Sequence, residues 1–144
     1  MEHNKDGVNC AVANQAIAEW YGMDHNKDIS NCAVVTLADY QHLAARTINT
    51  ELSKTDQGKH ALFGMCGEIG ELQSLYQKQY QGHPFDEQHA KKELGDLLWF
   101  IAEYCTAHDW TLEEIATMNI DKLKARYPEG FKAEQSLHRA EGDI

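Results

Sequence analysis

The sequence is poor in the residues that end helices and in paired cysteines. It contains 2 prolines and 10 glycines in 144 residues, too few turn-forming residues for a β-sandwich. The four cysteines are widely spaced and form no C-x-x-C pair, which argues against a zinc site and favours reduced thiols. We expect Cys66 and Cys105 to be small core residues. A single helical domain is the simplest interpretation.

Long apolar runs and an excess of positive charge are also missing. No segment approaches the length of a membrane span, and the N-terminal "MEHNKDGVN" lacks a signal-peptide pattern. A cytoplasmic protein is therefore expected. The formal net charge of -10 argues against a nucleic-acid backbone or an anionic membrane as a partner. Such an acidic chain is better suited to holding cations.

Three segments differ in pattern along the chain. Residues 1–35 are predicted to be an N-terminal extension, in which "MEHNKDGVNCAV" (1–12) nearly repeats as "MDHNKDISNCAV" (23–34). Two copies are too few for a solenoid, which needs about three or more repeats. The helical catalytic domain is predicted to cover residues 36–131, and residues 132–144 form a polar C-terminal tail.

Hydrophobic periodicity predicts four amphipathic helices in the central domain. Their expected ranges are about 36–52, 59–80, 86–107 and 111–127. Asp86 suits a helix N-cap, and Thr111 with Glu114 forms a capping box. "QGHPF" between the second and third helices breaks the chain. Four antiparallel helices with short links predict an all-α fold of the four-helix-bundle type.

Four carboxylates occupy matched positions on the second and third of these helices. Glu68 and Glu71 belong to "GEIGEL", and Glu93 and Asp96 belong to "KKELGDLLWF". In each pair, the two members lie roughly 80° and 140° from the centre of the apolar stripe. If the helices pack as a hairpin, the pairs can converge, and their repulsion then favours a bound cation. Oxygen ligands favour Mg²⁺, Mn²⁺ or Ca²⁺ over Zn²⁺.

The last helix decides between a solvated acidic surface and a binding site. Either acidic pair alone is more simply a solvated surface, but Asn119, Lys122 and Arg126 lie on or beside the apolar stripe of the last helix. Buried polar groups need partners. Donors that face an acidic cleft filled by a cation are what a polyphosphate requires. The alternative is that Lys122 and Arg126 extend from the edge of the stripe into solvent.

Side chains on the first and third helices are candidates for binding a base. These are Tyr40, His42 and Trp99. Trp99 is expected opposite the apolar stripe of its helix, where it either packs against a partner chain or stacks on a base. Of these two roles, the contact between subunits is favoured.

The segments "GEIGEL", "ELGDLLWFIA" and "NIDKLKARYPEGF" resemble the MazG-like nucleotide pyrophosphohydrolases, over roughly residues 37–137. The resemblance implies an all-α enzyme that uses Mg²⁺, with Mn²⁺ as a substitute, to split NTP or dNTP into the monophosphate and pyrophosphate. By position, it implies that the metal ligands are Glu68, Glu71, Glu93 and Asp96, and that the phosphate contacts are Asn119, Lys122 and Arg126. Many members carry Glu where this chain has Gly67.

The resemblance also implies a role and an assembly. Nucleotide-pool cleansing by a homodimer or homotetramer is expected, with Glu71 or Glu68 accepting the proton of the attacking water. A phosphoribosyl-ATP pyrophosphohydrolase-like enzyme is an alternative, although "RYPEGF" favours the cleansing branch. A non-catalytic helical interaction module would not explain the donors on the last helix. A ferritin-like di-iron protein needs Glu-x-x-His, where this chain has Glu71 and Asp96.

Overall fold

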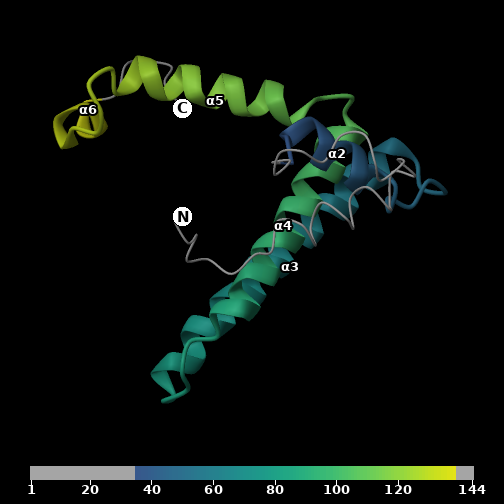
Figure 1. Cartoon of the computed structure of the whole chain (residues 1–144), viewed down its shortest axis with the longest axis horizontal. Helices are drawn as coiled ribbons and strands as arrows, with labels where there is room; N and C mark the ends of the chain where they lie inside the picture. The colour runs from purple at the N-terminus through teal and green to yellow at the C-terminus, as the bar shows by residue number, and fades with distance from the viewer. Residues whose placement is uncertain (1–34, 139–144) are drawn as a thin grey trace, which may run out of the picture. The chain divides into compact units, whose positions relative to one another are not determined.

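The computed structural model describes residues 35–138. All the regular secondary-structure elements in this range are helices. The elements are α2 (Leu37–Ala45), α3 (Lys54–Tyr80), α4 (Glu87–Ala107), α5 (Leu112–Arg126) and α6 (Ala133–Leu137) (Figure 1). The all-α prediction is confirmed, and α2 to α5 are the four helices expected. The duplicated segment lies outside the described residues, and the predicted domain boundaries stay predictions. Within the described range, no helix is both long and apolar enough to cross a bilayer.

Three of the helices begin at side-chain caps. The side chains of Ser53, Asp86 and Thr111 each accept a hydrogen bond from the backbone N–H three residues later. These bonds satisfy donors that the first turn of a helix leaves unpaired. The predicted caps at Asp86 and Thr111 are confirmed, whereas α3 begins at Lys54, earlier than its apolar pattern indicates.

The first helix is shorter than its hydrophobic pattern predicts and ends at Ala45. The hydroxyl of Thr47 donates to a backbone carbonyl three residues earlier at 2.8 Å, a local bond of the kind that competes with helix geometry. Gln57 then holds the turn that follows, because its amide donates to the carbonyls of Asn49 at 3.0 Å and Leu52 at 3.2 Å. These contacts are made by polar side chains, so hydrophobic periodicity does not predict them.

The helices α3 and α4 lie side by side as a hairpin (Figure 1). Small residues let them approach closely, since Ala61 and Ala102 are both completely buried. At Gly64, an added Cβ would lie 2.2 Å from the ring of Phe100, so α3 accommodates this ring only because the position is glycine. The hairpin is therefore a closely packed frame that fixes the register of its side chains.

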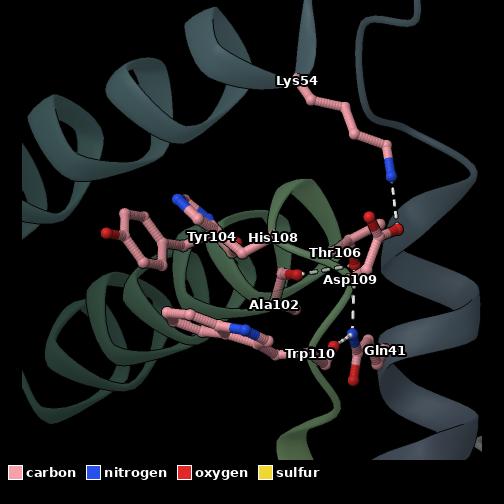
Figure 2. Close-up of polar contacts among 8 residues, drawn as sticks. All are labelled: Gln41, Lys54, Ala102, Tyr104, Thr106, His108, Asp109 and Trp110. Carbon is pink, nitrogen blue, oxygen red and sulfur yellow. Dashed lines mark hydrogen bonds and ion pairs between the residues drawn. The ribbon is translucent and has the colours of Figure 1, made fainter.

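A single glutamine joins α2 to the start of α5 (Figure 2). The amide of Gln41 donates to Thr106 Oγ1 at 3.2 Å and to the backbone carbonyl of Trp110 at 2.9 Å. Its oxygen accepts from the backbone N–H of Leu112 at 2.7 Å. Because these groups belong to the end of α4 and the start of α5, α2 fixes the point from which α5 extends.

The two cysteines in the described residues differ in burial, and both are free thiols. Cys105 belongs to the buried cluster that also contains Ala44, Ala102 and Leu112. Burial, with a smaller contribution from the charge of Glu114, raises the pKa of the Cys105 thiol. Cys66 is exposed on α3, so the expectation that it is a core residue is wrong.

Candidate metal centre

Two overlapping groups of side chains on the α3–α4 hairpin have the spacing of metal ligands. Glu68, Glu93 and Asp96 each place a carboxylate oxygen within 4.8 Å of the others. Glu71, His89 and Glu93 do the same with two carboxylates and an imidazole nitrogen, again within 4.8 Å. Glu93 belongs to both groups. The structure therefore brings the four carboxylates singled out from the sequence to one place on the hairpin, hereafter the acidic cluster.

The members of the acidic cluster differ in exposure. Glu93 is only 6% exposed and forms its floor. Glu68 is half-buried, and Glu71 and Asp96 are exposed at its rim. Because residues three apart lie about one turn apart on a helix, each helix contributes one deeper and one more open carboxylate. The cluster is thus anchored in the hairpin and open to solvent on one side.

The other carboxylates of the cluster disfavour the ionisation of Glu68. Desolvation raises the pKa of Glu68, and a hydrogen bond with Glu93 adds to the effect. The negative charges of Glu71, Asp96 and Glu93 raise the pKa of Glu68 further. These effects favour the protonated form of Glu68, and a bound cation would offset the repulsion.

Tyr40 links α2 to the rim of the acidic cluster. Its side chain is half-buried. Burial raises the pKa of the Tyr40 phenol, and the nearby charge of Asp96 raises it further. Of the three side chains predicted to bind a base, Tyr40 is therefore the one whose electrostatic environment includes a member of the cluster.

His89 is a member of the cluster that sequence reasoning missed. Its Nε2 lies 2.6 Å from Glu93 Oε1, and the ring is half-buried. The available signal was its spacing, because a residue four positions before Glu93 shares its face of the helix. Because a hard cation prefers oxygen ligands, the predicted ligand set contained carboxylates and not this imidazole.

The donor set fits a hard divalent cation. Most of the ligand atoms are carboxylate oxygens, which Mg²⁺ and Mn²⁺ prefer. The other three carboxylates raise the pKa of Glu68, and a bound cation would offset this repulsion. His89 adds one nitrogen, a ligand type that transition metals such as Mn²⁺ accept more readily than Mg²⁺ does.

The predicted phosphate contacts lie on α5, apart from the acidic cluster. Asn119 and Lys122 line a cavity of about 530 Å³ between α2 and α5, whose other walls include Leu37, Ile115 and Met118. Arg126 lies near the end of α5, with its guanidinium 5.9 Å from the centre of the Tyr127 ring. Within the described chain, α5 contacts α2, and the structure does not bring these three side chains into either ligand group.

The other two residues predicted to bind a base occupy different environments. His42 is exposed on α2. Trp99 is half-buried against the core of its own chain. Its indole N–H donates to Thr47 Oγ1 at 2.8 Å, and its ring meets Phe100 edge-on with centroids 5.0 Å apart. The placement of Trp99 opposite the buried side of its helix is therefore wrong, because the ring packs within the protomer.

The fold and the acidic cluster together define an all-α protein with a candidate metal site on a helical hairpin. The chain belongs to the MazG nucleotide pyrophosphohydrolase domain family, whose model matches residues 58–131. This match includes nearly all of α3 and the whole of α4 and α5, and hence every residue of the acidic cluster. Comparisons with curated proteins and with solved structures gave no match.

Proposed function

We propose that this protein is a Mg²⁺-dependent nucleoside triphosphate pyrophosphohydrolase. It would convert an NTP or dNTP to the monophosphate and pyrophosphate, and so remove unwanted nucleotides from the cellular pool. The observation that carries the proposal is the acidic cluster, which lies within the residues that match the family model. Four carboxylates, one of them on the buried Glu93, are costly without a cation and are well suited to holding one.

The metal ligands in this proposal are the four carboxylates of the hairpin. Glu93 would anchor the ion from the floor, and Glu68, Glu71 and Asp96 would complete the oxygen set from the rim. When bound, Mg²⁺ supplies charge neutralisation for the triphosphate and acidifies a water molecule. His89 would release Glu93 as the ion binds, or remain as a ligand when Mn²⁺ takes the place of Mg²⁺.

The hydrolytic step needs a proton acceptor close to the attacking water. The water oxygen attacks the α-phosphorus, the bond from this phosphorus to the bridging oxygen breaks, and pyrophosphate leaves. Glu71 or Glu68 would accept the proton that the water loses. Glu71 is the more exposed of the two, whereas the raised pKa of Glu68 makes it the stronger base.

The phosphate-binding side chains would reach the cluster from a second copy of the chain. Asn119, Lys122 and Arg126 lie on α5, which contacts α2 within its own protomer. A homodimer or homotetramer that sets α5 of one copy against the hairpin of another would complete the site. The donors would then stabilise charge on the leaving pyrophosphate.

The base would lie beyond the acidic cluster, towards α2. Tyr40 is the best placed of the predicted residues, because Asp96 already influences its hydroxyl. His42 could reach the base from the exposed side of α2. Trp99 would act indirectly, by fixing the neighbouring aromatic ring of Phe100.

Pyrophosphate release from a panel of NTPs and dNTPs, with Mg²⁺ and with chelator, tests this function. The variant is Glu71→Gln, and the matched control is Glu87→Gln, an exposed glutamate that pairs with Lys91 at 2.6 Å outside the cluster. We expect pyrophosphate that depends on Mg²⁺, a loss of at least about 100-fold in Glu71→Gln, and no loss in the control. Release of orthophosphate alone, or full activity of Glu71→Gln, would contradict the proposal.

A further inference from the structure

A buried carboxylate outside the acidic cluster has one oxygen without a partner. Glu103 on α4 is 1% exposed. Its Oε2 lies 2.9 Å from His60 Nδ1 on α3. Within the described residues, its Oε1 is buried and has no hydrogen-bond partner. A half-satisfied buried carboxylate destabilises a fold unless its charge is compensated, and the hydrolytic step above does not use it.

The partner of this carboxylate, His60, lies beside two neighbouring aromatic rings. The centre of its imidazole is 5.6 Å from the centre of the Phe100 ring and 6.5 Å from that of the Trp99 ring. Gly64 makes room for Phe100, so the arrangement is built into the hairpin. The His60 side chain is nevertheless 52% exposed. Because Nδ1 faces the buried Glu103, Nε2 on the opposite side of the ring faces the open side.

The burial of Glu103 determines which atom of His60 carries a hydrogen. If Glu103 is ionised and His60 is protonated, both ring nitrogens carry one. If the shared proton lies on Glu103, its O–H donates to Nδ1, and the neutral ring carries its hydrogen on Nε2. In the third arrangement a neutral ring donates Nδ1–H to an ionised Glu103, which leaves a full charge on a buried carboxylate whose other oxygen has no partner among the described residues. Both compensated states therefore present an Nε2–H donor to the open side.

The His60–Glu103 pair lies one nucleoside away from the acidic cluster. His60 precedes Glu68 by eight residues on α3, a rise of about 12 Å, and Glu103 follows Asp96 by seven residues on α4, a rise of about 10 Å. These spacings keep each residue within about 80° of its cluster counterpart around the helix axis. With the phosphates at the cluster, this rise is close to the length of a nucleoside, so the far edge of a nucleobase would reach this pair.

We propose that His60 Nε2–H donates a hydrogen bond to the keto oxygen on the far edge of the base, and that Glu103 is the positioning residue that keeps this nitrogen protonated. This inference rests on the proposed function, because it requires a nucleotide to be bound at the acidic cluster. The substrate class is then nucleotides with a keto group at purine C6 or pyrimidine C4. Adenine and cytosine carry an amino group there, and two donors facing each other repel.

Binding of matched monophosphates tests the proposal without relying on turnover. Calorimetry compares dIMP with dAMP, and dUMP with dCMP, because within each pair the main difference is keto against amino. The variant is the double substitution His60→Phe with Glu103→Leu, which removes both partners and leaves no unpaired buried charge. The control is His108→Phe, at a histidine that stacks on Tyr104 at the end of α4. Thermal melting shows whether both variants are folded.

The wild type and the control are expected to bind the keto member of at least one pair about tenfold more tightly. The double variant is expected to lose that preference while its affinity for the amino member changes less than about twofold. No preference in the wild type, or its persistence in the double variant, would overturn the proposal. Pyrophosphate release is measured in parallel, so a wild type that shows the preference without releasing pyrophosphate would refute only the proposed function.

Discussion

Glu93 is the least exposed member of the acidic cluster and the residue that its two ligand groups share. His89 Nε2 approaches one of its oxygens at 2.6 Å, and the negative charge of Glu93 helps to raise the pKa of Glu68. At the scale of single residues, Glu93 is therefore the point at which an imidazole and the other carboxylates meet.

The raised pKa of Glu68 predicts how the stability of the metal-free protein depends on pH. Its folded pKa lies above the ordinary value of 4.5, so its stabilising contribution is fully present below about pH 4.5 and is lost as pH rises through the folded pKa. In chelator, the free energy of unfolding of the wild type should therefore fall relative to that of Glu68→Gln as pH rises. Urea titrations across this range measure the difference.

Glu87→Gln is the control for this prediction, with an effect of opposite sign. The hydrogen bond from Lys91 and its charge lower the pKa of Glu87, so the contribution of Glu87 is present above its ordinary pKa and lost on acidification. Glu87 is exposed, and its effect should be small. If the free energy of unfolding depends on pH in the same way for the wild type and Glu68→Gln in chelator, the carboxylates of the cluster do not repel Glu68.

At the scale of helices, two glycines on α3 have opposite roles. An added Cβ at Gly64 would lie 2.2 Å from the Phe100 ring, whereas one at Gly67 would meet nothing within 4 Å. Gly64→Ala should therefore destabilise the protein by about 1–3 kcal/mol through overpacking. Gly67→Ala should stabilise it by about 0.5–1 kcal/mol, because alanine is the better helix former.

Chemical denaturation of both alanine variants measures these effects. The two positions lie on the same helix, so a general change in helix propensity would move both in the same direction. A stabilised Gly64→Ala would mean that Phe100 does not pack against α3 as described. The aromatic setting of His60 would then need revision, because the same ring lies against it.

The sequence predicted those features of the helices that local chemistry determines. Asp86 and Thr111 cap their helices as expected, because an N-cap acts on N–H groups within one turn. The spacing of the carboxylates was likewise enough to predict their convergence on a hairpin. The early end of α2 was missed because it depends on polar contacts of Thr47 and Gln57, which hydrophobic periodicity does not include.

Features that depend on tertiary packing were less accessible. Trp99 was expected outside the core because its position on the helical wheel lies away from the apolar stripe, yet α2 packs over α4 and covers it. Cys66 was expected inside for the converse reason and is exposed. The pairing of His60 with Glu103 joins two helices, so no local pattern in either segment indicates it.

At the scale of the whole molecule, a row of apolar side chains on α3 is half exposed among the described residues. Leu62, Ile69 and Tyr76 recur every seventh residue on α3 and are 50%, 53% and 53% exposed. Heptad spacing of this kind is typical of a helix that packs along another helix. Within residues 35–138, the Tyr76 ring meets Phe85 with centres 4.9 Å apart, but each side chain of the row stays half exposed, which is consistent with the proposed self-association.

Light scattering at micromolar concentration should find a dimer or tetramer. Leu62→Arg should weaken the assembly by at least about tenfold, because it places an unpaired charge in an apolar contact. Gln77→Arg adds the same charge at another exposed position of α3 and should leave the assembly intact. If the wild type remains monomeric, α5 of a second copy cannot complete the site, and that part of the proposal is contradicted.

The most direct test of the account is Mn²⁺ binding, followed by the electron paramagnetic resonance signal of the free ion. The wild type and Glu87→Gln should bind Mn²⁺ saturably, and Mg²⁺ should displace it. Glu93→Gln should bind at least about tenfold more weakly, because it alters the carboxylate that both ligand groups share. Equal binding by Glu93→Gln and the wild type, or no binding at millimolar Mn²⁺, would contradict the assignment of the acidic cluster as a metal site.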